Sequence, residues 1–210
     1  MKRVINKSSQ SLRDKMKLLG IFSGAIVAAL LISIASDAQA QSRRPSGVAS
    51  LGEMACENTT QQGPDLGNFN VRYIPINREI LFGNTAIRAI AYFGTQSWLA
   101  GRGGFDRGSS ITIVCRLAQS DQTPRFRNLK LAFGFNALDE QQRNYREAVL
   151  KFSIYRDGED YPYISEFLRI GDRQRLDVDI AGVRRIKLQA QCLGYSNACP
   201  GLYFFEDLLQ

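Results

Sequence analysis

The sequence contains no histidine among its 210 residues. This absence excludes Ser-His-Asp and Cys-His catalysis, general acid or base work by an imidazole, and metal sites with histidine ligands. Reactions that use a pair of carboxylates, or a serine together with a lysine, remain open. The composition therefore favours a binding or structural role over catalysis.

Beyond position 40 the chain has little net charge. The whole sequence carries 27 Lys and Arg against 20 Asp and Glu, a formal charge of +7. Six of these bases and two of these acids lie in residues 1–40, which leaves 21 bases and 18 acids, or +3, for the rest. A mildly basic domain of this kind does not indicate nucleic acid as a partner.

Residues 1–40 have the three-part layout of a bacterial secretory signal peptide. Residues 1–17 are polar and basic, residues 18–35 are mainly apolar and uncharged, and residues 38–40 form an A-x-A cleavage pattern. We expect a signal helix that is removed by cleavage after Ala40, with no membrane segment left. An uncleaved anchor is the alternative, although 18 residues is near the lower limit for a span. Either route predicts a secreted or periplasmic chain.

Cysteine is scarce, with four residues that all lie in the expected exported part: Cys56, Cys115, Cys192 and Cys199. An even number in an oxidising compartment predicts two disulfides. A turn-rich segment separates Cys192 from Cys199, which favours that pair and leaves Cys56 with Cys115. A zinc site is the alternative, but structural zinc sites usually take thiolates from closely spaced pairs, and no C-x-x-C is present.

Long Ala-, Leu-, Glu- and Lys-rich stretches and internal repeats are absent after the N-terminal segment. Residues 41–64 are instead rich in Ser, Gly and Gln, and we interpret them as a flexible leader. From there short runs of alternating apolar and polar residues recur, as in strands with one face on a core. They lie at 69–73, 86–93, 111–117, 129–135, 150–154, 161–168, 176–180, 186–192 and 202–209. The alternating runs therefore predict that residues 65–210 form an all-β, antiparallel β-sandwich or barrel.

The C-terminal part has a characteristic order of short motifs. They are AFGFN at 132–136, VLKFSIYRDG at 149–158, LRIGD at 168–172, LDVDIAGV at 176–183 and RIKLQA at 185–190. In this order the stretch from about Leu129 to Leu209 resembles the C-terminal half of the NPCBM family of carbohydrate-binding modules. The resemblance implies a galactose-binding-like jelly roll, a β-sandwich, and implies carbohydrate as a ligand class. Residues 65–125 fit the first half of the family loosely.

The only tryptophan lies in a glycine-rich loop that we single out as the candidate ligand-binding segment. Trp98, Arg102 and Arg107 occur there among several glycines. An indole and a guanidinium on such a loop can stack on a sugar ring and hydrogen-bond its hydroxyls, and loops at the end of a sandwich often bind ligands. The alternative is that Trp98 fills the core beneath a long loop.

Acidic residues crowd one expected hairpin, with Asp157, Glu159 and Asp160 after Arg156, and Asp139 and Glu140 before it. Carboxylates in such numbers can hold Ca²⁺. A solvated turn explains them as well, because Asp-Gly between two β runs is a strong hairpin signal. We expect no metal and no cofactor.

Together these features predict an exported, non-catalytic domain that binds a carbohydrate or another cell-envelope polymer. The alternative is a structural or protein-interaction domain of the cell envelope with no sugar ligand. A hydrolase that uses carboxylates is a third and weaker interpretation, because no acid pair stands out from the sequence.

Overall fold

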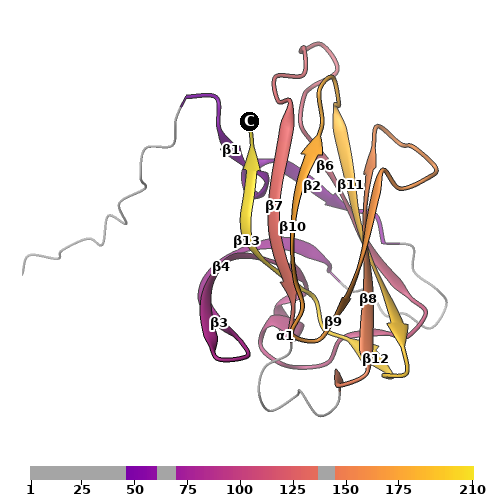
Figure 1. Ribbon diagram of the computed structural model, residues 1–210. Coiled ribbons are helices and arrows are strands. Elements are labelled where there is room, and N and C mark those ends of the chain that lie inside the picture. Colours follow the sequence, from indigo (N-terminus) through magenta and orange to yellow (C-terminus); the bar gives the residue numbers. More distant parts are fainter. Residues whose placement is uncertain (1–45, 61–69, 137–144) are drawn as a thin grey trace, which may run out of the picture. The chain divides into compact units, whose positions relative to one another are not determined.

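The computed structural model describes residues 46–60, 70–136 and 145–210, and these residues form two facing antiparallel sheets (Figure 1). Sheet A consists, in spatial order, of β10 (Arg173–Asp179), β7 (Asn128–Phe135), β13 (Leu202–Leu209), β4 (Thr85–Gly94) and β3 (Arg72–Phe82), with β1 (Ala49–Ser50) on β13. Sheet B consists of β2 (Ala55–Asn58), β6 (Ser110–Arg116), β11 (Arg185–Gly194), β8 (Ala148–Arg156) and β9 (Ile164–Arg169). The all-β antiparallel sandwich expected from the alternating runs is confirmed.

Three short elements complete the fold. β5 (Phe105–Asp106) pairs with β12 (Ala198–Cys199), and the helical turns are η1 (Leu51–Glu53) and α1 (Gln96–Leu99). In the described part of the chain, no helix is both long enough and apolar enough to cross a membrane. The expected signal segment, residues 1–40, lies outside the described residues and keeps the status of a prediction.

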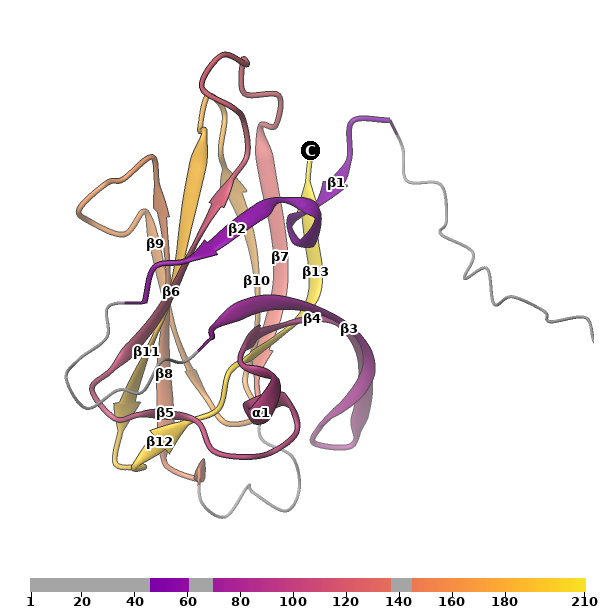
Figure 2. The ribbon, with the colours of Figure 1, turned by 180° about the vertical axis from the view of Figure 1, so that it is seen from behind.

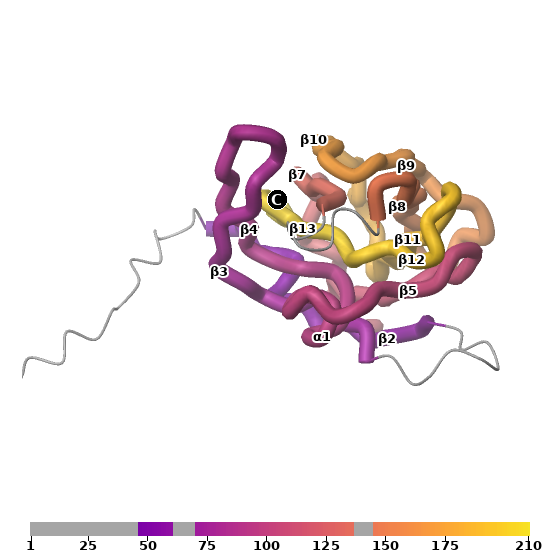
Figure 3. The backbone as a smooth tube through the Cα atoms, turned by 90° about the horizontal axis from the view of Figure 1, so that it is seen from below, coloured from indigo at the N-terminus to yellow at the C-terminus, as the bar shows by residue number. Residues whose placement is uncertain are grey.

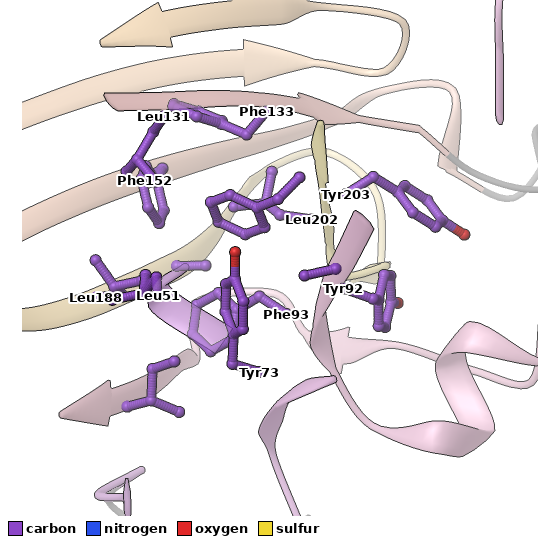
Figure 4. Packing of buried hydrophobic residues seen from close by; sticks show 14 of the residues in the cluster. Leu51, Tyr73, Tyr92, Phe93, Leu131, Phe133, Phe152, Leu188, Leu202 and Tyr203 are labelled. Atoms are coloured by element: carbon purple, nitrogen blue, oxygen red, sulfur yellow. The ribbon is translucent and has the colours of Figure 1, made fainter. Parts of the chain in front are cut away.

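The core lies between the sheets and is built by alternation along each strand. In β8, for example, Leu150, Phe152 and Ile154 are fully buried, while Lys151 between them is partly exposed. Aromatic rings from both sheets meet in the middle of this core (Figure 4), where Phe133 of β7 lies 4.7 Å from Phe152 of β8. Burying one such side chain contributes about 1.5–3 kcal/mol, so the aromatic centre is a main source of stability.

The chain passes repeatedly between the two sheets. β7 belongs to sheet A, β8 and β9 to sheet B, β10 to sheet A, and β11 again to sheet B. Consecutive strands that change sheet, such as β10 and β11, therefore do not pair, whereas β8 and β9, in the same sheet, do. The exchange between layers is what brings loops from distant parts of the sequence together at each end of the sandwich.

Part of the expected leader is integrated into the sandwich, which differs from the boundary expected near residue 65. β1 pairs with β13 of sheet A, and β2 pairs with β6 of sheet B. Ser50 donates its hydroxyl proton to the buried carboxylate of Asp207 at 2.7 Å, and Tyr73 donates to the same oxygen at 2.9 Å. The sequence does not reveal β1 and β2, because strands of two and four residues are too short to show an alternating pattern.

Both disulfides join the cysteines paired in the sequence analysis. Cys56 of β2 bonds to Cys115 of β6, and Cys192 bonds to Cys199. The first bond fixes the N-terminal strand β2 onto sheet B, directly opposite its partner in the β-ladder. The second closes a loop at one end of the sandwich, next to the candidate ligand-binding segment.

Candidate functional site

Trp98 occupies the first turn of α1, within the glycine-rich loop, and its indole points inward. The hydroxyl of Thr95 caps this helix by accepting a hydrogen bond from the Trp98 amide at 3.2 Å. The Trp98 side chain is only 4% exposed, and its ring stacks on Phe105 with 5.6 Å between centroids. This burial agrees with the alternative interpretation of Trp98 as a core residue. The Trp98 indole therefore has no exposed face on which a sugar ring could stack.

Arg107, from the same loop, lies beside a different aromatic residue. Its guanidinium carbon is 5.7 Å from the ring centroid of Tyr195, which is within the range of a cation–π contact. Tyr195 is 81% exposed, so its ring is available to a ligand. Arg102 is also exposed, and its amide donates to the carbonyl of Ser97 at 2.8 Å. The structure thus pairs Arg107 with Tyr195 in place of Trp98.

The loop 94–108 and the loop that carries Tyr195 are braced against each other. β5 and β12 pair so that Phe105 lies opposite Cys199, and the Arg107 amide donates to the carbonyl of Asn197 at 2.9 Å. A Cβ on Gly104 would collide with the carbonyl of Cys199, so only glycine permits this approach. α1, β5 and β12 lie together at one end of the sandwich (Figure 2), and the Cys192–Cys199 bond fixes that end.

A hollow of about 490 Å³ adjoins α1, a volume within the usual range for ligand pockets. Its lining combines neutral polar and apolar groups with one arginine: Asn70, Arg72, Tyr73, Ile74, Pro75, Thr95, Gln96 and Ser97. Arg72 donates from Nε to the side-chain oxygen of Asn70 at 2.8 Å, and the Thr95 and Ser97 hydroxyls are 2.9 Å apart. Such groups bind hydroxyl-rich ligands by hydrogen bonding and are poorly suited to proton transfer at neutral pH.

A second hollow, of about 380 Å³, shares part of its lining with the first. It is lined by residues of β2 and its neighbourhood together with the start of β3, namely Gly52, Met54, Cys56, Asn58, Asn70, Val71, Arg72 and Tyr73. The two hollows share Asn70, Arg72 and Tyr73, so both adjoin the beginning of β3. The phenol of Tyr73 points away from both toward Asp207, and its pKa is raised well above the usual value by burial and by that carboxylate.

The acids of the β8–β9 hairpin have structural partners. Asp157 accepts hydrogen bonds from the amides of Arg184 and Arg185 at 2.9 and 2.8 Å, which ties the turn to the start of β11. Glu159 forms an ion pair with Arg156 at 3.3 Å. Within residues 46–60, 70–136 and 145–210 no three His, Cys, Asp or Glu residues gather as a metal site would require. Asp139 and Glu140 lie outside the described residues.

One candidate residue escaped the sequence analysis. Tyr195 follows Gly194 in the turn between two cysteines that were expected to bond, and an aromatic residue at the tip of a loop closed by a disulfide is held away from the core. The position of Tyr195 between these two cysteines in the sequence therefore indicates an exposed aromatic residue. Its neighbour Arg107 was found because the glycine-rich loop drew attention to it.

No family model matches this chain, and no curated protein matches it. Among solved structures, CBM51 from Clostridium perfringens GH95, in complex with methyl-galactose, is similar with 17% identity, 78% of this chain covered, 99% of that chain covered and a TM-score of 0.50.

The tandem CBM51 modules of Sp3GH98, a family 98 glycoside hydrolase from Streptococcus pneumoniae SP3-BS71, are similar with 15% identity, 77% of this chain covered, 46% of that chain covered and a TM-score of 0.53. At these identities the likeness establishes a shared β-sandwich fold, the fold of carbohydrate-binding modules of the CBM51 group.

Proposed function

We propose that this chain is an exported, non-catalytic carbohydrate-binding domain that uses Tyr195, Arg107 and Arg102 at one end of the sandwich. The observation that carries the proposal is the exposed ring of Tyr195 with the guanidinium of Arg107 beside it. The fold supports it, because CBM51 modules share that fold and one of them was solved with methyl-galactose. The motifs between Leu129 and Leu209 add the resemblance to the NPCBM family.

The chemistry of this end suits a sugar. A phenol ring packs against the C–H face of a pyranose, and a guanidinium offers a rigid fork of donors to adjacent hydroxyls. Because the Cys192–Cys199 bond and the β5–β12 pairing already fix both loops, little conformational entropy is lost when a ligand binds. Binding of this kind needs no residue that transfers protons.

Export fits the two disulfides, since such bonds persist in oxidising compartments. We infer that residues 1–40 direct the chain out of the cytoplasm and are removed there. The partner is then a glycan or another polymer of the cell envelope. This inference is tested by the N-terminal sequence of the exported protein, which should begin at Gln41.

A second candidate function is a protein-interaction domain of the envelope. It is favoured by exposed aromatic side chains on the β8–β9 hairpin, where Tyr161 is 84% and Phe167 is 59% exposed. Exposed apolar groups that gather on one element often mark a protein contact. In that case the partner would bind sheet B and the end with Tyr195 would remain free.

A glycan array, probed with the full chain under non-reducing conditions, tests the proposed function. We expect binding to a subset of glycans that Tyr195→Ala abolishes and Arg107→Gln weakens. Tyr161→Ala is the matched control, because it removes an equally exposed phenol from a different loop. Absence of binding to every glycan, or equal loss with Tyr161→Ala, would contradict the assignment and favour the protein-interaction function.

A further inference from the structure

The outer face of sheet A contains a hollow that none of the preceding features explains. Leu131, Phe133 and Phe135 of β7 point into the core, so Ala132 and Gly134, which alternate with them, lie on the outer face. Neither of these two residues has a large side chain. The neighbouring strand β13 has a β-bulge at Phe205, where the register with β7 shifts between Phe204 and Glu206. Bulges redirect side chains and often lie next to functional sites.

The β3–β4 hairpin supplies a wall for this hollow. A register shift between Pro75 and Arg78 bends the hairpin, and Figures 1 and 3 show β3 and β4 curling together away from the rest of the sheet. Near its tip, Phe82 lies 5.3 Å from Phe205 in an edge-on contact. A Cβ on Gly134 would come within 2.6 Å of the Phe82 ring, so the glycine lets the hairpin pack on β7.

The resulting hollow, here called the sheet-A trough, has a volume of about 390 Å³. It is lined by Ile87, Ala132, Arg173, Gln174, Arg175 and Phe205. One side of it is thus apolar, and the other side carries two arginines from one face of β10. The volume fits one or two sugar residues, given the usual size of ligand pockets.

The two arginines of the trough are available to an anion. Both are exposed, and across the described ranges the ion pairs formed are Arg116 with Glu57 and Arg156 with Glu159, which leaves Arg173 and Arg175 without one. Arg173 is held over the ring of Phe82, with its guanidinium carbon 5.9 Å from the centroid.

At least three carboxylates, those of Glu206, Asp177 and Asp179, occur on the same face of sheet A. Glu206 lies opposite Ala132 in the ladder and Asp177 lies opposite Lys130. None of them forms an ion pair with an arginine of the trough within 4.0 Å. The charged residues that line the trough itself, Arg173 and Arg175, are both basic.

We propose that the sheet-A trough binds an acidic saccharide, with the carboxylate of a uronic acid residue between Arg173 and Arg175 and the sugar ring against Phe205. Guanidinium groups recognise carboxylates through paired, charge-assisted hydrogen bonds. The apolar wall of Ile87 and Phe205 suits the C–H face of a pyranose. This site does not depend on Tyr195, because it lies on the face of a sheet and not in the loops at its end.

The test is titration calorimetry of the full chain with tetragalacturonate and, separately, with the neutral galactose tetramer. We expect the acidic oligosaccharide to bind and salt to weaken it. Arg175→Gln or Arg173→Gln should lower its affinity by roughly tenfold or more, since a charge-assisted hydrogen bond is lost. Ala132→Leu should cause a similar loss by filling the trough while both arginines remain. Arg185→Gln, an exposed arginine of sheet B, is the matched control and should change nothing.

Three results would overturn the proposal. The first is no binding of tetragalacturonate at millimolar concentration, or equal affinity for the neutral tetramer. The second is unchanged affinity in the Arg175 and Ala132 variants together with loss in Tyr195→Ala, which would move the acidic sugar to the end of the sandwich and leave the proposed function intact. The third is full competition by inorganic phosphate with no contribution from the sugar, which would make the trough a phosphate site.

Discussion

The outer faces of the two sheets differ in how their surface is filled. On sheet B, side chains from adjacent strands bond to one another: Tyr155 donates to Gln189 at 2.9 Å, Gln189 donates to Thr112 at 3.4 Å, and the hydroxyls of Ser153 and Ser165 are 2.8 Å apart. Lys187 lies over the Tyr155 ring at 3.6 Å and extends the same row. These polar groups satisfy each other's hydrogen-bonding capacity.

Sheet A shows the opposite arrangement. Ala132 leaves a hollow on its outer face, the Phe82 ring packs on Gly134 beside it, a bulge turns Phe205 outward, and Arg173 and Arg175 border the hollow. A hollow on a sheet face therefore arises where outward side chains are short, and the arginines that border this one form no ion pair within the described part of the chain. On the outer face of sheet B these donors and acceptors already bond to one another, so fewer of them are left to bond to a ligand.

The largest expected effect is the loss of stability at high pH, because sheet A buries the three tyrosines Tyr73, Tyr92 and Tyr203. Burial raises the pKa of Tyr73, with Asp207 adding to the shift, and burial also raises the pKa of Tyr92 far above its usual value. The unfolded chain ionises these phenols near pH 10, so stability is complete below that pH and is lost above it. We expect each phenol to contribute a slope of about 1.4 kcal/mol per pH unit.

Denaturant unfolding between pH 9 and pH 12 measures this slope. Tyr73→Phe should lower stability near neutral pH, because the hydrogen bond to Asp207 is lost, and should make the alkaline fall shallower. Tyr161→Phe is the matched control, since that side chain is 84% exposed. An unchanged slope in Tyr73→Phe would show that the tyrosines of sheet A do not govern alkaline unfolding.

A smaller effect is expected from replacing one residue on each outer face by alanine. Gly134→Ala places a Cβ against Phe82 and should destabilise the chain by about 1–3 kcal/mol, because the hairpin must lift. Gln191→Ala on the outer face of β11 should change stability by less than about 0.5 kcal/mol. The measurement is the unfolding free energy together with proteolysis of the β3–β4 hairpin. Equal effects of the two changes would contradict the difference between the faces.

The smallest effect is expected on sheet B. Tyr155→Phe removes the hydrogen bond to Gln189 but keeps the ring beneath Lys187, so we expect a loss of about 0.5–1.5 kcal/mol. Thermal unfolding checks this value. The same variant should bind sugars as the unchanged chain does, and weaker binding would place a ligand on sheet B.

The strands and the turns were largely predictable from the sequence, because alternation and turn chemistry act over a few residues. The Asp157-Gly158 turn is present, with both residues at positive φ, and the alternating run 186–192 is the middle of β11. The arrangement of strands was not predictable. β10 and β11 follow one another but lie in different sheets, since layer choice depends on contacts between residues far apart in sequence.

The candidate site was predictable only in part. Arg107 was found from its glycine-rich loop, whereas Trp98 proved to be buried and Tyr195 took the position beside Arg107. A single sequence cannot show which of two aromatic residues on neighbouring loops faces solvent. The sheet-A trough was not visible at all, because it depends on a bulge at Phe205 and on the bending of a hairpin.

The two proposed sugar sites are tested most directly by mapping amide chemical shifts of the full chain during titration with neutral and with acidic oligosaccharides. We predict that neutral sugars shift the amides around Arg107 and Tyr195, and that acidic sugars also shift those of Ala132 and Arg175. Shifts confined to Ser153, Gln189 and their neighbours on sheet B, or no shifts with any sugar, would contradict both proposals.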